Sequence, residues 1–135
     1  MDYSKLSDQE INKLVAFALG CKEVVPDIFM DDVRRYEFDK PKNKSGSKFY
    51  FDPCNNPADA WAIISDNRIA IIPDSAEGEW VAFNEFTLYE GDWMFSSDPT
   101  HHSNGKNPLR CVMECFLMMQ ESANVPANST GSDIR

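Results

Sequence analysis

Apolar residues recur near the start of the chain at the spacing of one helix face. Ser7-Asp8-Gln9-Glu10 is typical of a capping box, in which a hydroxyl and a carboxylate satisfy two backbone amides at a helix start. The apolar positions that follow at helical spacing are Ile11, Leu14, Val15, Ala18 and Leu19. Gly20 stands where a helix commonly ends in the left-handed conformation. We therefore predict a helix between Ser7 and Gly20 that buries one face.

Two further helices are predicted by Asn-Pro pairs, because Asn caps a helix well and Pro fits its first position. The first starts at Asn56-Pro57 and ends near Asn67. Its inner side should carry Ala58, Trp61, Ala62 and either Ile64 or Ser65. The second starts at Asn107-Pro108, and its apolar stripe consists of Leu109, Val112, Met113, Phe116 and either Met119 or Gln120. Further apolar residues widen that stripe, which predicts burial on more than one side.

Short apolar runs between the helices predict strands. Residues 48–52 form an aromatic run, and residues 68–72 and 79–83 flank a turn as the two arms of a hairpin would. Weaker candidates are residues 24–25, 28–29, 36–38, 87–89 and 93–95. The order of these elements implies an α+β fold with three helices packed on an antiparallel sheet. An α-β-α sandwich is one arrangement that these elements allow.

The length of 135 residues predicts one domain. We place this domain at residues 1–122 and expect the polar residues 123–135 to form a mobile C-terminal tail. No apolar run approaches the ~20 residues that a membrane-spanning helix needs. The first residues lack the basic start and apolar run of a signal peptide. These features predict a cytoplasmic protein with no membrane partner.

Acidic residues are concentrated in the middle of the chain. The formal net charge is -9, from 22 acidic and 13 basic residues. Residues 49–98 hold ten acids and a single base, Arg68. Residues 40–48 hold four lysines among Gly, Ser and Asn, which is typical of a solvated loop. Binding to duplex nucleic acid needs a broad basic surface, so we expect no duplex partner.

The four cysteines, Cys21, Cys54, Cys111 and Cys115, contain no C-x-x-C pair and are expected to be free thiols. Cys111 and Cys115 lie one helical turn apart, shortly after His101-His102. A zinc site can be drawn from these residues, but their spacing matches no standard ligand pattern. We predict no metal or other cofactor, although the sequence alone leaves this region open as a metal site.

The chain contains no phosphate loop, dinucleotide fingerprint or Gly-x-Ser-x-Gly elbow. Asp98, His101, His102 and Ser103 are close in sequence, but such nearness does not assemble a catalytic triad. We interpret residues 98–105 as a polar loop. The prediction is therefore a non-enzymatic protein with no catalytic residues.

Three stretches together resemble the bacteriophage NinX family. They are Asp2-Tyr3-Ser4-Lys5-Leu6-Ser7-Asp8, Cys54-Asn55-Asn56-Pro57-Ala58-Asp59-Ala60-Trp61 and Lys106-Asn107-Pro108-Leu109-Arg110. More distantly, a helix with an aromatic residue, then strands, then a final Asn-Pro helix is similar to phage ABA-sandwich domains, which place helices on both faces of a sheet. The resemblance implies an accessory protein of a temperate phage or prophage in a bacterial host cell. It implies no particular activity.

The two Asn-Pro helix starts are the best candidates for a binding site. A helix N-terminus presents unpaired amides and partial positive charge, which suit phosphate or carboxylate. Arg110 can grip a phosphate with paired hydrogen bonds, Asp59 can accept from hydroxyls or amines, and Trp61 can stack on a base. The candidate ligand-binding residues are Asn56, Asp59, Trp61, Lys106, Asn107 and Arg110.

Each candidate also has a purely structural interpretation. The two asparagines can simply cap their helices, and Trp61 can belong to the core. Arg110 can form an ion pair on the surface. If Arg110 instead binds a ligand, we predict that Arg110→Ala leaves folding nearly intact and weakens binding of any anionic ligand.

We hypothesise a phage accessory protein that acts as a binding module and sequesters a nucleotide-like small ligand, such as a signal of host defence. The alternative is an acidic protein that inhibits a host factor through residues 49–98. A metal-dependent hydrolase is a third and weaker hypothesis. The expected partner is therefore a small anionic or nucleotide-like ligand or a host protein, and a homo-oligomer remains open.

Overall fold

The computed structural model describes residues 2–30, 48–85 and 101–124. Its helices are the 3-10 helix η1 (Tyr3–Lys5) and the α-helices α1 (Asp8–Ala18), α2 (Pro57–Asn67) and α3 (Pro108–Asn124). Its strands are β1 (Lys22–Val25), β2 (Ile28–Met30), β3 (Lys48–Tyr50), β4 (Ala70–Asp74), β5 (Glu79–Phe83) and β6 (His102–Gly105). The predicted α+β class is confirmed.

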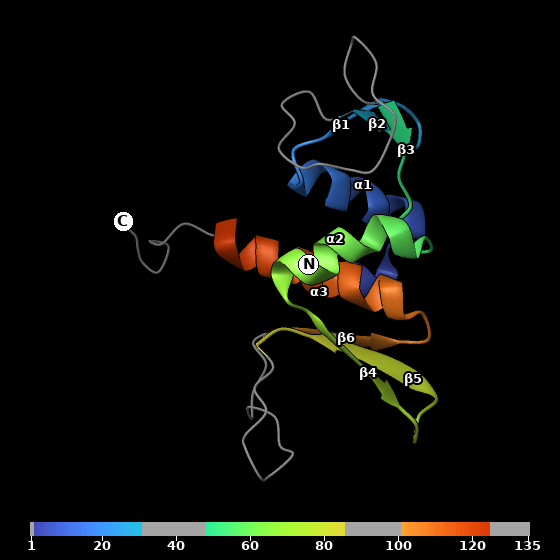
Figure 1. Cartoon of the computed structure of the whole chain (residues 1–135), viewed down its shortest axis with the longest axis vertical. Coiled ribbons are helices and arrows are strands. Elements are labelled where there is room, and N and C mark those ends of the chain that lie inside the picture. Colours follow the sequence, from blue (N-terminus) through green and yellow to red (C-terminus); the bar gives the residue numbers. More distant parts are fainter. Residues whose placement is uncertain (1, 31–47, 86–100, 125–135) are drawn as a thin grey trace.

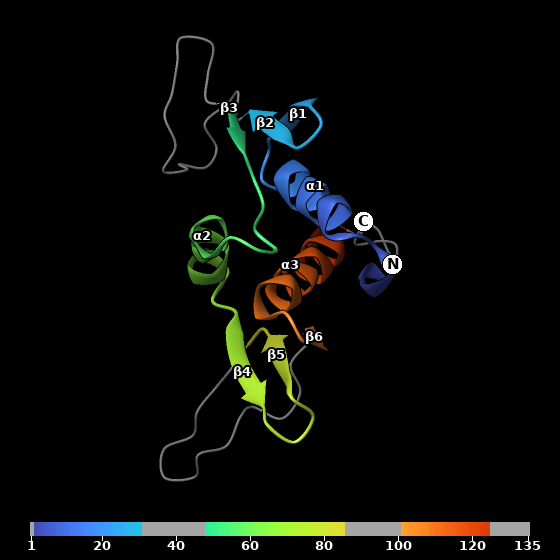
Figure 2. The same cartoon turned by 90° about the vertical axis from the view of Figure 1, so that its right-hand side faces the viewer.

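The strands form two antiparallel sheets, ordered β1-β2-β3 and β4-β5-β6. The helices lie between them, as Figures 1 and 2 show from two directions. This order of layers differs from the α-β-α sandwich that the elements also allowed. The physical reason is α3, whose residues 111–117 are all buried. A helix whose central residues are buried on every side must be covered on every side, so it takes the middle layer and the sheets take the outside.

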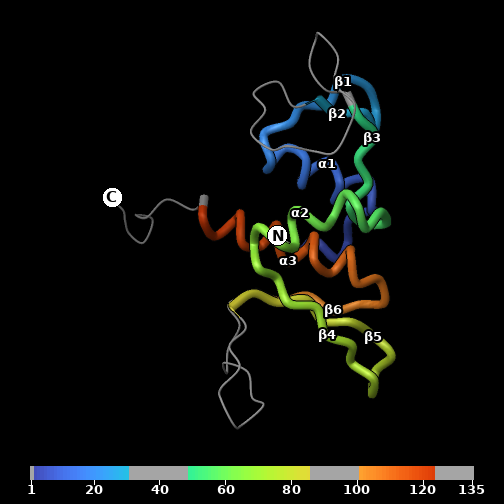
Figure 3. The backbone as a smooth tube through the Cα atoms, viewed as in Figure 1, coloured from blue at the N-terminus to red at the C-terminus, as the bar shows by residue number. Residues whose placement is uncertain are grey.

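Helix α3 packs most extensively against β5 and β6, and on its other side against α1 and α2. The tube in Figure 3 follows the chain through these layers, with α3 between α1 and the β4-β5-β6 sheet. Near the other sheet, Phe29, Phe49 and Phe51 form edge-to-face contacts with ring centroids 6.3 and 5.9 Å apart. These rings belong to the same core as α1 and α3, so one core joins both sheets.

The capping box of α1 is confirmed. Glu10 N donates to Ser7 Oγ over 3.1 Å, and Ser7 N donates to Glu10 Oε1 over 2.8 Å. Gly20 adopts the expected left-handed conformation with φ 92°. Most of the predicted apolar face is buried or half-buried, but Ala18 is exposed and the polar Asn12 is buried in its stead.

The predicted inner face of α2 is wrong. Trp61 is 64% exposed, whereas Asp59 is 3% exposed and lies among the buried residues of the helix with Ala60 and Ile63. The side chain of Asp59 accepts a hydrogen bond from the backbone N–H of Asp52 over 2.9 Å. That inward-facing acid sets the rotation of the helix, and the tryptophan is thereby turned outward.

The strand predictions hold with two corrections. Strand β4 begins at Ala70, two residues later than predicted, because Arg68 caps α2 in the left-handed conformation. Residues 102–105, interpreted as polar loop, form strand β6, whose register pairs Phe83 with His102 and Trp80 with Gly105. Their polar sequence has no strand periodicity, so pairing with β5 decides their conformation. The candidates at 36–38, 87–89 and 93–95 lie outside the described residues.

Helix α3 runs to Asn124, two residues past the predicted domain boundary. Residues 125–135 of the predicted tail lie outside the described residues. Within the described part of the chain, no helix combines the length and apolarity that crossing a membrane requires.

Candidate functional site

The two Asn-Pro helix starts lie side by side. Asn107 Oδ1 accepts from Leu109 N and Arg110 N over 3.0 and 3.3 Å, which caps α3. Asn107 Nδ2 donates to Cys54 O over 2.8 Å and to Asn55 Oδ1 over 3.3 Å. Asn56 caps α2 by accepting from Ala58 N over 2.9 Å. The capping role of both asparagines is confirmed, and Asn107 also joins the two helix starts.

Arg110 reaches across this region to the N-terminal segment. Its Nε donates to Glu114 Oε2 over 2.8 Å, and its Nη1 donates to Asp8 Oδ1 over 2.7 Å. Its Nη2 donates to the carbonyl oxygens of Tyr3 and Leu6 over 3.0 and 2.6 Å. Four of the five guanidinium N–H donors therefore have protein acceptors.

The interpretation of Arg110 as part of an exposed ion pair is wrong, because the Arg110 side chain is only 18% exposed. The hydrogen bond from Arg110 lowers the pKa of the Asp8 carboxyl below its usual value, and partial burial opposes this shift. Glu114 also accepts a hydrogen bond from Ser103 Oγ over 2.5 Å, which ties β6 to the same group of charges. Arg110 thus links η1, the start of α1, α3 and, through Glu114, β6.

A second chain of contacts joins α1 to the turn before α2. Asn12 Nδ2 donates to Asp52 Oδ1 over 2.7 Å, and Cys54 N donates to Asn12 Oδ1 over 3.1 Å. Asn55 Nδ2 donates to Asp8 Oδ2 over 3.2 Å. We call the connected side chains the polar hub: Asp8, Asn12, Asp52, Asn55, Asp59, Asn107, Arg110 and Glu114.

The position of the hub has an electrostatic reason. The three α-helices run in the same direction in Figure 1, so their N-termini meet at one end of the molecule. Three partial positive charges converge there, and carboxylates near helix N-termini offset them. Asp8 and Asp59 both lie in first helical turns. The hub thus connects the starts of the helices, and its polar groups mainly form hydrogen bonds with one another.

Three of the six predicted binding residues belong to the hub, one lies at its edge, and two lie away from it. Lys106 and Trp61 are exposed, before α3 and on α2 respectively. Asn56 caps α2 at the edge of the hub, and Asp59, Asn107 and Arg110 belong to it. The structure therefore gathers four of the candidates at one place and leaves two on the surface.

The cysteines are buried thiols. Cys111 Sγ donates to Trp80 O, and Cys115 Sγ donates to His101 O, each over 3.7 Å. Burial raises the pKa of Cys111 to about 11 and that of Cys115 to about 12, so both are neutral near pH 7. Within residues 2–30, 48–85 and 101–124, no three His, Cys, Asp or Glu side chains are grouped to hold a metal ion.

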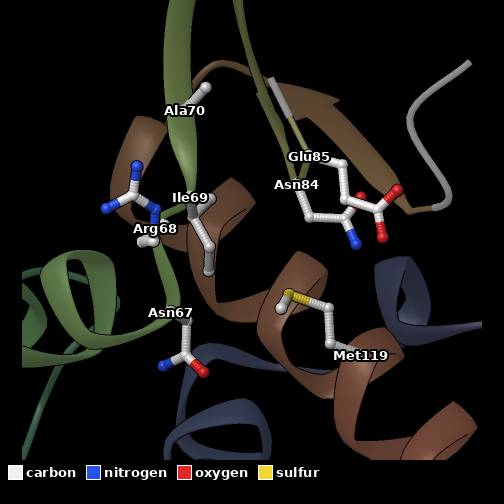
Figure 4. A pocket seen from close by; sticks show the side chains of 7 residues that line it. All are labelled: Asn67, Arg68, Ile69, Ala70, Asn84, Glu85 and Met119. Atoms are coloured by element: carbon white, nitrogen blue, oxygen red, sulfur yellow. The ribbon is translucent and has the colours of Figure 1, made fainter. Parts of the chain in front are cut away.

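A cavity lies at the opposite end of α2, where the sequence suggested no site. Its volume is about 400 Å³. It is lined by Asn67, Arg68, Ile69, Ala70, Asn84, Glu85 and Met119. Figure 4 shows Ile69 and Met119 in the middle, between Asn67 and Arg68 on one side and Asn84 and Glu85 on the other. None of the six residues predicted from the sequence lines it.

The two charged residues of this cavity share an unusual backbone conformation. Arg68 has φ 54° and Glu85 has φ 59°, in the left-handed region that costs a non-glycine residue energy. Such conformations concentrate at functional sites, where the surrounding structure holds them in place. Asn84, only 5% exposed, fixes the strand end beside Glu85, because its Oδ1 accepts from His101 N over 3.0 Å.

Arg68 and Glu85 do not pair across the cavity. In the described part of the chain, neither side chain forms a hydrogen bond or an ion pair. Both are exposed, and Figure 4 shows them on opposite sides of the cavity, with the Arg68 guanidinium and the Glu85 carboxylate pointing away from each other. This arrangement differs from the hub, where each charge meets its partner within the protein.

One signal in the sequence points to this cavity. Arg68 is the single base among the ten acids of residues 49–98. Glu85 follows 17 positions later, and Met119 comes from a distant helix, so only the folded chain brings these three residues to one cavity.

A family model described as Bacteriophage P22, NinX matches residues 2–120. The chain belongs to the NinX family of bacteriophage proteins. No individual curated protein matches it significantly. The matched region of this NinX-family protein contains every residue of the polar hub and of the 400 Å³ cavity.

Proposed function

We propose that this NinX-family protein is a non-enzymatic binding module that holds a small nucleotide-like ligand in the cavity beside Arg68. The observation that carries the proposal is the pair of unmatched opposite charges across that cavity. Ligand sites are typically concave and mostly apolar, with a few polar groups that fix orientation. The cavity combines both kinds of group: Ile69, Ala70 and Met119 form its apolar part, and the polar part is Asn67, Arg68, Asn84 and Glu85.

A nucleotide offers a complementary group to each part of the cavity. Its phosphate suits the guanidinium of Arg68, which can form paired charge-assisted hydrogen bonds. Its sugar hydroxyls or base amine suit the carboxylate of Glu85. Its base suits contact with Met119, whose polarisable sulfur favours aromatic rings. The sequence-based hypothesis of a nucleotide-like ligand is therefore retained, at a different set of residues.

Binding without conversion would serve a phage protein by lowering the free concentration of the ligand in the host cell. We propose sequestration of a nucleotide signal, such as one used in host defence, as the biological role. This role needs binding in a stoichiometric ratio and no turnover of the ligand.

The full chain should be tested by calorimetric titration with nucleosides and nucleotides, together with mass spectrometry of any ligand released on denaturation. The decisive variant is Arg68→Gly, because glycine adopts the left-handed conformation freely and should leave the fold intact. We expect it to weaken binding more than tenfold, as loss of a charge-assisted hydrogen bond does. Lys106→Ala removes the same charge at an exposed position outside the cavity and should bind as the parent does.

Absence of any nucleoside or nucleotide binding at millimolar concentration would contradict the proposal. So would a loss of binding that is equal in Arg68→Gly and Lys106→Ala. Turnover of a bound nucleotide would contradict its non-enzymatic part.

One observation favours the second candidate function, an acidic protein that binds a host factor. Trp61 is 64% exposed on α2, and exposed tryptophans are enriched among residues that dominate protein interfaces. Affinity capture from host lysate at low and high salt tests this alternative, with Trp61→Ala compared with Phe17→Ala, an exposed aromatic on α1. Capture that needs Trp61 and falls with salt would support it, and salt-insensitive capture would contradict its electrostatic part.

A further inference from the structure

We infer that the cavity beside Arg68 selects ligands with one phosphate group over nucleoside polyphosphates. This inference rests on the proposed function and specifies its ligand class. Three independent features carry it: the charge of the lining, the direction of α2 and the size of the cavity.

The lining residues carry one positive and one negative charge. Arg68 is the only base among the lining residues that the structure describes, and Glu85 is the only acid. Sites that hold di- or triphosphates commonly combine a lysine or further arginine with a metal ion or a glycine-rich backbone cradle. Among the described lining residues, a triphosphate would meet a single guanidinium and would place its remaining negative charge near Glu85.

The direction of α2 lowers the positive potential further. The helix ends at Asn67, and Asn67 and Arg68 both line the cavity, so the C-terminal end of α2 lies beside it. A helix C-terminus carries a partial negative charge that a nearby cation offsets. Part of the field of Arg68 therefore balances its own helix, and the remainder suits one phosphate group. The positive ends of all three α-helices lie at the other end of the molecule, in the polar hub (Figure 1).

The carboxylate of Glu85 and the amide oxygen of Asn67 supply acceptors for hydrogen-bond donors of the ligand. Asn67 Nδ2 donates to Ile63 O over 2.8 Å, which fixes the side chain and leaves its oxygen as the remaining polar atom. A volume of about 400 Å³ lies at the lower end of the range for ligand sites. The fitting chemistry is a nucleoside that carries one phosphate, either a monoester or a cyclic diester.

The experiment is a calorimetric titration of the full chain, without divalent cations and at one ionic strength. The probes are adenosine, adenosine 5′-monophosphate, adenosine 3′,5′-cyclic monophosphate and adenosine 5′-triphosphate, with the guanosine series alongside. We expect one of the monophosphates to bind at least tenfold tighter than both the nucleoside and the triphosphate. The monoester and cyclic arms distinguish the two sources of a single phosphate.

Two variants assign the selectivity to the cavity. In Arg68→Gly the advantage of the monophosphate over the nucleoside should vanish. In Glu85→Gln the triphosphate should gain at least threefold relative to the monophosphate, because the repelling carboxylate is removed. Glu77→Gln removes the same charge from an exposed position outside the cavity and should leave the ratio unchanged.

The outcomes separate this inference from the proposed function. Tightest binding of the triphosphate would overturn the selectivity and leave the nucleotide-binding function standing. An equal affinity for nucleoside and monophosphate would overturn the selectivity and the assignment of the phosphate to Arg68, and would leave only binding of the nucleoside part standing. Failure of every probe to bind would overturn both.

Discussion

An arginine lies near each end of the helical layer, and the two have opposite surroundings. Arg110, at the start of α3, is only 18% exposed and donates four hydrogen bonds to two carboxylates and two carbonyl groups. Arg68, just past the end of α2, is exposed and lines a cavity opposite a carboxylate with which it does not pair. The same type of side chain therefore serves as a clamp at one end and has no partner among the described residues at the other.

The difference shows how a motif can mislead. Arg110 stands in the first turn of an Asn-Pro helix, a place suited to an anionic ligand. In the folded chain the anions at that place are Asp8 and Glu114 of the protein itself. Arg68 belongs to no motif, yet its charge has no protein partner among the described residues. In this protein, an arginine without a partner among the described residues is therefore a better indication of a site than a helix start.

The largest expected effect on stability comes from breaking the clamp. Arg110→Ala should lower the free energy of unfolding by about 3 kcal/mol, because it leaves Glu114 and Asp8 without their cation and frees the Tyr3 and Leu6 carbonyls. Urea denaturation measures this loss. Lys106→Ala, at an exposed position, should stay within about 0.5 kcal/mol of the parent. A loss below about 1 kcal/mol for Arg110→Ala would show it to be an ordinary surface ion pair.

A smaller effect separates the two helix caps. Asn107→Ala should cost about 2 kcal/mol, because it removes both the cap of α3 and the hydrogen bond to Cys54 O. Asn56→Ala should cost about 1 kcal/mol, because that side chain only caps α2. The two variants unfolded side by side measure the difference. Equal costs would mean that the bridge between the helix starts contributes nothing.

Arg68 should behave in the reverse way from Arg110. Arg68→Gly should raise the stability of the ligand-free protein by up to about 1 kcal/mol, because it relieves a left-handed residue with φ 54°. Arg68→Ala keeps that strain and should give no such gain. Thermal melts of both variants decide the matter. Destabilisation by Arg68→Gly beyond about 1 kcal/mol would mean that the side chain has a structural role after all.

The smallest effect concerns acid. The hydrogen bond that Asp8 accepts from Arg110 holds the pKa of Asp8 below its usual value, so the protonated form of Asp8 is disfavoured in the folded state. The resulting stability is present above the unfolded pKa near 3.9 and is lost as pH falls through the lower folded value. Because Asp8 is 40% exposed, solvent screening limits the contribution to under about 1 kcal/mol.

Melting curves between pH 2 and 6 test this expectation. In Asp8→Asn the decline of stability in acid should be shallower than in the parent. Asp66→Asn, which removes a carboxylate from an exposed position of α2, serves as the control. Identical acid profiles for Asp8→Asn and Asp66→Asn would contradict the role of the Arg110 contact.

Local sequence determined the helices, their caps and the α+β class. The capping box at Ser7, the Asn-Pro starts and the broad apolar surface of α3 are each encoded within a few residues, and each is found as predicted. Hydrogen bonds between a side chain and the next helical turn need no distant partner. The apolar residues of α3 also extend beyond one helix face, and from this local pattern the sequence alone indicated that α3 is buried on more than one side.

Tertiary structure decided what the local pattern leaves open. The rotation of α2 follows a hydrogen bond from Asp52 to Asp59, and β6 exists because β5 pairs with a polar segment. The two sheets lie outside the helices because α3 demands cover on every side. Whether an arginine is a clamp or stays unpaired depends on which charges the fold brings within hydrogen-bond distance. Asp8 is 102 residues from Arg110, and that separation is why only the folded chain could assign the two arginines.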